Sequence, residues 1–132
     1  MGYDLSMRLA YLLPFLLCSC ADPGLLFYTG ALTPHDQAVF REAALIEGVE
    51  VINNDSPSVI RVEYKSIADV DGRFDSSARA IYLNPNFHTP GCPRDQDALS
   101  IFRHEIGHAK SKGHSSNPAS VMYYNPPCWP DD

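Results

Sequence analysis

Three histidines and one glutamate between His104 and His114 form the part of the sequence best suited to chemistry, HEIGHAKSKGH. His104 and His108 are four residues apart, so on a helix their side chains share one face and can bind one metal ion. Glu105 is rotated by about 100° from His104, which suits a general base acting on a water beside the metal. Three protein ligands and one water are typical of a catalytic zinc site.

His114 is the candidate for the third ligand, and it requires a turn in the chain. A continuing helix would place it about 240° from His108, on the wrong face. Such a turn usually contains a residue with positive φ, which glycine adopts without a steric cost. Either Ser111 adopts this conformation at a cost of about 1 kcal/mol, or the turn is shifted toward Gly113. The sequence leaves both interpretations open.

The pattern His104-Glu105-x-x-His108-x-x-Ser111-x-x-His114 resembles the zinc signature of the metzincin metallopeptidases, with Ser111 in place of their glycine. The segment GHSSNPASVMYY resembles the matrixins, because a serine follows the third histidine and Met122 comes eight residues after that histidine. The resemblance covers roughly residues 98–124. It implies that Met122 is the methionine of the turn beneath the metal, as an apolar floor for the histidines.

The resemblance also implies an activity, that of a zinc endopeptidase. Zinc would lower the pKa of its bound water toward about 7, and Glu105 would take a proton from that water as it attacks a peptide carbonyl. The alternative is a non-catalytic zinc-containing domain that binds peptides or proteins at a cell surface. Glu105 argues against the alternative, because a structural site has no use for a base.

Two further features follow from the same resemblance. A tyrosine two residues after the methionine helps to stabilise the transition state in astacins and serralysins, whereas the matrixin pattern lacks it. For Tyr124 this role and a place in the wall of the specificity pocket are both open. The strand expected over residues 80–83 would form the upper rim of the cleft, with a backbone edge able to pair with an extended peptide.

Residues 1–20 read as a signal peptide, preceding one domain over residues 21–132. Arg8 precedes an apolar run from Leu9 to Leu17 that is too short to span a bilayer. Leu17-Cys18-Ser19-Cys20 resembles a bacterial lipobox, which implies lipidation of Cys20; an ordinary cleaved signal is the alternative. Asp4 is out of place in such a leader, so we expect translation to begin at Met7 rather than at Met1. We expect an exported protein, either a cell-envelope lipoprotein or a secreted one.

Cys92 and Cys128 remain after the leader, and both lie in proline-rich loops. In an oxidising compartment they form a candidate disulfide, and two free thiols are the alternative.

The remaining elements predict an α+β fold in which a small sheet packs on two helices. Thr33, Pro34 and Gly48 mark the start and end of the first helix. Alternating residues predict strands over 49–55, 58–66 and 79–86, with a polar loop over 67–78. The second helix, which carries HEIGH, runs from about Asp95 or Asp97 to Lys110. An irregular C-terminal part containing the methionine turn follows, so the layout is metzincin-like.

The chain has 132 residues and a formal net charge of −6, with no basic run. The length allows one domain, and the acidic balance argues against a nucleic-acid partner. We expect a monomer that acts on a peptide or protein and contacts a membrane only through its signal or lipid anchor.

Overall fold

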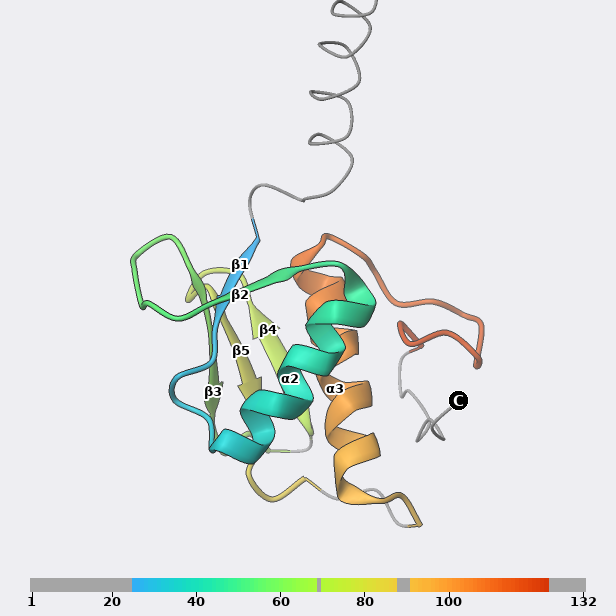
Figure 1. Ribbon diagram of the computed structural model, residues 1–132. Coiled ribbons are helices and arrows are strands. Elements are labelled where there is room, and N and C mark those ends of the chain that lie inside the picture. Colours follow the sequence, from blue (N-terminus) through green and yellow to red (C-terminus); the bar gives the residue numbers. More distant parts are fainter. Residues whose placement is uncertain (1–24, 69, 88–90, 124–132) are drawn as a thin grey trace, which may run out of the picture.

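The computed structural model of the chain describes residues 25–68, 70–87 and 91–123. This part forms one mixed sheet and two helices, which confirms the α+β class (Figure 1). The elements are, in chain order, β1 (Leu26–Tyr28), α2 (Pro34–Glu47), β2 (Glu50–Ile52), β3 (Ile60–Tyr64), β4 (Gly72–Asp75), β5 (Ala80–Leu83) and α3 (Arg94–Ala109).

The strand order in the sheet is β2-β1-β3-β5-β4. All neighbouring pairs are parallel except β4 and β5, which are antiparallel. The prediction of a loop over residues 67–78 was therefore wrong, since β4 lies within it. The strands on either side of the turn at 53–57 do not pair with each other, because the unpredicted β1 lies between them.

Helix α2 begins and ends where its capping residues predict. The Thr33 hydroxyl oxygen accepts a hydrogen bond from the Asp36 backbone N–H at 3.2 Å, and Pro34 is the first helical residue. Gly48 ends the helix in the left-handed conformation, with φ of 71°. Local sequence signals thus account for both ends.

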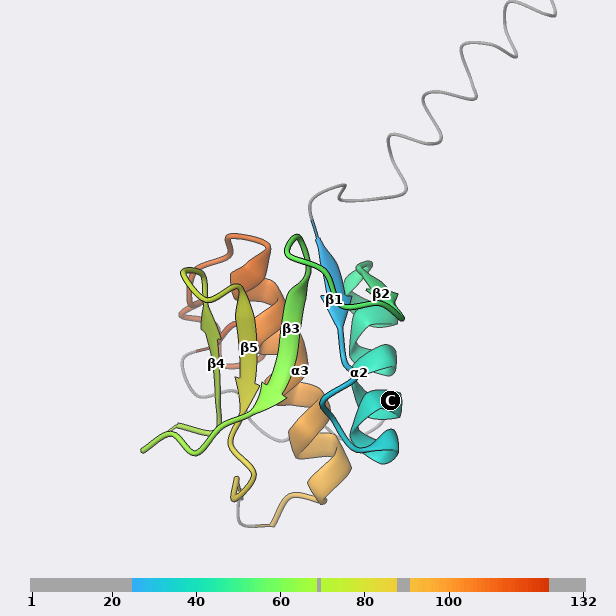
Figure 2. The ribbon, with the colours of Figure 1, turned by 90° about the vertical axis from the view of Figure 1, so that its left-hand side faces the viewer.

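Both helices cover the same face of the sheet, and the core lies between these two layers (Figure 2). Phe40 of α2 contacts Phe27 of β1 and Phe102 of α3, with ring centroids 5.5 and 5.0 Å apart. All three rings are fully buried. Burial of aromatic side chains of this size is a large stabilising contribution, and it fixes α3 against the sheet.

Polar contacts hold α3 to α2 at both ends. The buried Asp36 carboxylate accepts hydrogen bonds from the Arg94 guanidinium at 2.6 and 3.0 Å, and from the Tyr64 hydroxyl. The Arg94 hydrogen bond holds the pKa of Asp36 below its usual value, against the opposing effect of burial. At the far end, Arg103 and Lys110 donate to the Glu47 carboxylate and backbone carbonyl at 2.9 and 2.8 Å.

Within the described residues, neither helix is long and apolar enough to cross a membrane.

Candidate metal centre

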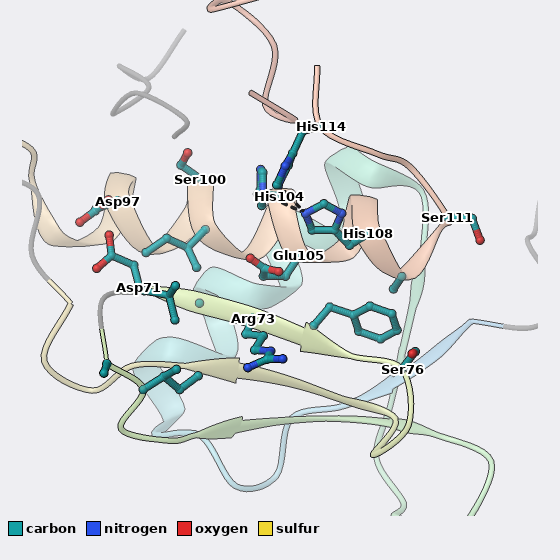
Figure 3. A pocket seen from close by; sticks show the side chains of 17 residues that line it. Asp71, Arg73, Ser76, Asp97, Ser100, His104, Glu105, His108, Ser111 and His114 are labelled. Carbon is teal, nitrogen blue, oxygen red and sulfur yellow. Dashed lines mark hydrogen bonds between the residues drawn. The ribbon is translucent and has the colours of Figure 1, made fainter. Parts of the chain in front are cut away.

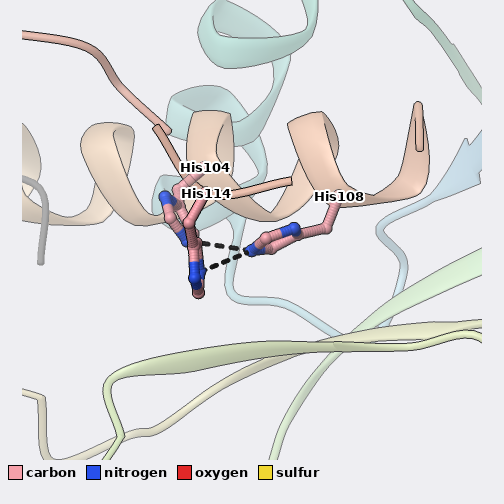
Figure 4. Close-up of side chains that lie close together, drawn as sticks. All are labelled: His104, His108 and His114. Carbon is pink, nitrogen blue, oxygen red and sulfur yellow. Dashed lines mark hydrogen bonds between the residues drawn. The ribbon is translucent and has the colours of Figure 1, made fainter. Parts of the chain in front are cut away.

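The structure brings the three predicted histidines together (Figure 4). The Nε2 atom of His108 lies 3.0 Å from Nε2 of His104 and 3.2 Å from Nε2 of His114. His104 is buried, His108 is half-buried and His114, from the loop after α3, is exposed. The cluster is therefore anchored in the core and open to solvent on the His114 side.

Backbone carbonyl groups orient the first two rings. His104 Nδ1 donates to the Val121 carbonyl at 2.7 Å, and His108 Nδ1 donates to the Lys112 carbonyl at 2.9 Å. A carbonyl oxygen only accepts, so each Nδ1 carries a proton, and in the neutral ring Nε2 presents its lone pair. Two such lone pairs approach each other favourably only when a cation lies between them.

The geometry and the electrostatics of the cluster fit a metal ion. Two nitrogens bound tetrahedrally at about 2.05 Å from one zinc would be about 3.3 Å apart, close to the separations observed. Burial lowers the pKa of His104, with the neighbouring charges of His108 and His114 acting in the same direction against the hydrogen bond to Val121. A lowered pKa favours the neutral imidazole that binds a metal.

The turn after α3 has its positive φ at Ser111, at 66°, rather than at Gly113. The Lys112 N–H donates to the Gly107 carbonyl and the Ser111 N–H to the His108 carbonyl, both at 2.9 Å. This pair of bonds is the Schellman arrangement that ends many helices, with Ser111 where glycine is usual. Of the two interpretations of the sequence, the structure adopts the one with Ser111 left-handed.

Glu105 lies on the cleft side of α3, near the histidines (Figure 3). Its side chain is buried, and burial raises the pKa of the carboxyl to about 7, although a hydrogen bond from the Phe74 backbone N–H of β4 opposes the shift. A carboxyl group with a pKa in this range can both accept and release a proton near neutral pH.

A cleft of about 950 Å³ runs between α3 and β4 and reaches the three histidines. Its rim strand is β4, whereas the family resemblance implied this position for the strand over 80–83. The assignment was wrong because β5 is interior, with β3 on one side and β4 on the other. Among the described strands, β4 has no neighbour on its outer edge, so that edge is available for pairing along the cleft.

Met122 is buried against α3. A Cβ atom placed on Gly107 would lie 2.2 Å from the Met122 sulfur, so the glycine makes room for this side chain. The Met122 carbonyl accepts from the Ser115 N–H at 2.7 Å, and the preceding residue, Val121, supplies the carbonyl for His104. The segment around Met122 is thus attached to the metal centre through its backbone.

Several predicted site residues lie outside the described part of the chain. They are Cys20 and the rest of the leader over 1–20, Tyr124 and Cys128. Cys92 is disulfide-bonded, and its pairing with Cys128 stays a prediction.

The groups that support the centre differ in how visible they are in the sequence. The carbonyls of Val121 and Lys112 leave no signal, because every residue carries a carbonyl. Gly107 did leave one: a glycine in a helix interior costs about 1 kcal/mol relative to alanine and often marks close packing.

No family model matches the chain, and no curated protein matches it. Among solved structures, the chain is similar to myroilysin, with a TM-score of 0.51 and 16% sequence identity. The match covers 73% of this chain and 52% of the myroilysin chain, so the chain spans about half the length of that structure. At this identity the likeness is one of fold alone.

Proposed function

We propose that the protein is a zinc-dependent endopeptidase of the metzincin type. The observation that carries the proposal is the convergence of His104, His108 and His114 beside the buried Glu105, in a cleft bordered by an open strand edge. Likeness in fold to the metalloprotease myroilysin supports the same class.

The three histidines would hold the metal through Nε2, since the Nδ1 atoms of His104 and His108 are engaged by carbonyl groups. Zinc, when bound, supplies Lewis acidity, which lowers the pKa of a water and polarises a carbonyl oxygen.

Glu105 is the general base. It accepts a proton from the attacking water and delivers it to the amine that leaves. Its buried position and the hydrogen bond from Phe74 hold the carboxylate on the cleft side of α3.

The open edge of β4 is suited to hold an extended peptide by backbone hydrogen bonds, which fixes the scissile bond relative to Glu105. In the same proposal Met122 is the methionine beneath the metal, and Tyr124 assists at the oxyanion or lines the specificity pocket. Export, lipidation of Cys20, the Cys92–Cys128 disulfide and a monomeric state belong to the proposal as well.

The test is the Glu105→Gln variant of the purified protein, which keeps the shape of the side chain and removes the base. We expect it to retain one zinc per chain and to lose peptide cleavage by at least a factor of about 100. Glu42→Gln, at an exposed position on α2, is the matched control and should keep both properties.

Zinc content is measured by elemental analysis, and cleavage with a library of quenched peptides, with and without a chelator. Cleavage by the Glu105 variant at the wild-type rate would refute the mechanism. Stoichiometric zinc without cleavage by the wild type would favour the non-catalytic zinc-containing binding domain.

A further inference from the structure

The connection between β3 and β4 forms part of the wall of the cleft. Four of its residues line the cleft, and we term them the β3–β4 wall: Ile67, Ala68, Val70 and Asp71. Helix α3 lines the same end of the cleft with Asp97, Ser100 and Ile101. In Figure 3, Asp71, Asp97 and Ser100 lie on one side of the three histidines and Ser111 lies on the other. The β3–β4 wall therefore borders the end of the cleft nearest the start of α3.

The strand order determines where this connection runs. Strands β3 and β4 lie on either side of β5, so the connection between them crosses one end of β5. Tyr64 at the end of β3 and Gly72 at the start of β4 are both in register with Leu83, the last residue of β5. The next residue, Asn84, therefore lies where the connection crosses the sheet.

Asn84 binds the connection through three backbone carbonyl groups. Its side-chain amide donates to the Ile67 carbonyl at 2.9 Å and to the Val70 carbonyl at 3.1 Å. Its backbone N–H donates to the Asp71 carbonyl at 2.8 Å. The side-chain oxygen accepts from the Asn86 N–H at 3.1 Å, so both amide protons are directed at the wall. A side-chain amide offers two N–H donors, whereas an ionised carboxylate offers none.

The surface that Asn84 holds in place is largely apolar. Val70 is 41% exposed, which is unusual for a large apolar side chain, and it lines the cleft together with Ile67 and with Ile101 of α3. Exposed apolar side chains in a cleft are available to a ligand, and covering them removes apolar surface from water. This end of the cleft is therefore suited to an apolar side chain.

We propose that Asn84 is a positioning residue for substrate recognition, which holds the β3–β4 wall so that Ile67 and Val70 select an apolar side chain of the bound peptide. The inference rests on the proposed endopeptidase function. Because the amide binds the carbonyl groups of Ile67 and Val70, it also fixes where the aliphatic side chains of these two residues lie relative to α3. Without the amide the wall is free to shift, and discrimination against a polar side chain falls.

Discrimination is measured on the purified full-length protein with pairs of quenched peptides. The two members carry leucine or asparagine, which are similar in size, at one position at a time around the cleavage site. The wild type should prefer leucine at one of these positions. Asn84→Ala and Asn84→Asp should lower the leucine-to-asparagine ratio of kcat/KM there by about tenfold, the lower end of the effect of one methylene-sized contact in a pocket.

A second variant tests the wall itself. Val70→Thr keeps the shape of an exposed side chain and adds a hydroxyl, so it should fold normally and lower the ratio at the same peptide position. Asn86→Asp is the matched control, because it introduces the same charge as Asn84→Asp and retains the backbone N–H that binds Asn84. Its ratio should equal that of the wild type. Zinc content and melting temperature are measured in parallel, and zinc content should be the same in all variants.

The outcomes separate the inference from the function on which it rests. Lower ratios at one shared position in the Asn84 and Val70 variants, with zinc retained, support the inference. A wild-type ratio in Val70→Thr or in the Asn84 variants would overturn it, because Asn84 would then act on stability alone. An equal fall in Asn86→Asp would also overturn it, because charge would be the cause. Absence of any cleavage by the zinc-loaded wild type would refute the proposed function, and the inference with it.

Discussion

The contact between Gly107 and Met122 predicts that Gly107→Ala lowers the free energy of unfolding when Met122 is present and raises it when Met122 is replaced by alanine. Replacement of Gly107 by alanine adds a Cβ atom 2.2 Å from the Met122 sulfur and 3.0 Å from its terminal methyl carbon. Ordinary contacts of this kind begin at about 3.4 Å, so the sulfur has to move by about 1.2 Å (3.4 − 2.2). Met122 is buried, and its backbone is held by Ser115, so the displacement has little room.

The magnitude follows from two opposing terms. Overpacking costs about 1–3 kcal/mol, and replacing glycine by alanine in a helix gains about 1 kcal/mol. We therefore expect Gly107→Ala to lower the free energy of unfolding by up to about 2 kcal/mol. In a Met122→Ala background the clash is absent and the new methyl group fills part of the vacated space. The same substitution should then raise the free energy of unfolding by about 1 kcal/mol.

Urea unfolding of the wild type, both single variants and the double variant measures this coupling, at a fixed free zinc concentration and again with a chelator. Gly113→Ala is the control, since a Cβ atom there meets no neighbour within 4 Å. Equal losses from Gly107→Ala in both backgrounds would show that Met122 does not lie on Gly107. The position of Met122 against α3 would then be incorrect.

Three further predictions concern the Asp36–Arg94 contact, the packing of β4 on α3 and the bound metal. The hydrogen bond from Arg94 lowers the pKa of Asp36 in the folded protein. Ionised Asp36 therefore stabilises the fold at pH values above its usual pKa of 3.8, and this contribution is lost as the pH falls below 3.8. The difference in free energy of unfolding between the wild type and Asp36→Asn, measured with urea, should become smaller below pH 3.8. A difference that does not change with pH would contradict a stabilising role of ionised Asp36. Gly72→Ala places a Cβ atom 2.5 Å from the side chain of Ile101 on α3. It should lower the free energy of unfolding by about 1–3 kcal/mol and should also lower the rate of peptide cleavage. No change in either quantity would contradict the packing of β4 on α3. Removal of metal by a chelator should lower the melting temperature, and added zinc should restore it in proportion to the logarithm of its concentration; identical melting curves would argue against a bound metal.

The parts of the fold that the sequence predicts are those determined by neighbouring residues. Thr33 and Gly48 correctly predict the two ends of α2, because capping depends on residues within one turn of the helix end. Strand β4 was missed because Asp71-Gly72 reads as a turn and Arg73 and Asp75 are polar, which an edge strand permits. The three-residue β1 is stabilised by parallel partners distant in the sequence, so its own residues carry little signal.

In the candidate metal centre too, the features set by neighbouring residues are predictable from the sequence, and those that depend on distant residues are not. His104 and His108 follow from helical spacing, and His114 from the need for a turn. The carbonyls that orient two of the rings come from Lys112 and Val121, and the second of these is 17 residues from His104. No side-chain pattern specifies which carbonyl a ring will find, so these partners become visible only in the folded chain.

Helical geometry also explains why the turn falls at Ser111 and not at the neighbouring glycine. If α3 continued to Gly113, two further residues would rotate the chain by about 200° and advance it by about 3 Å. One residue would then remain to return His114 to the other two histidines. The observed turn leaves three residues after the left-handed Ser111, from Lys112 to His114, and that length brings His114 Nε2 to Nε2 of His108. The length of chain between the second and third histidines therefore selects the position of the turn, even though the residue there has the higher conformational cost.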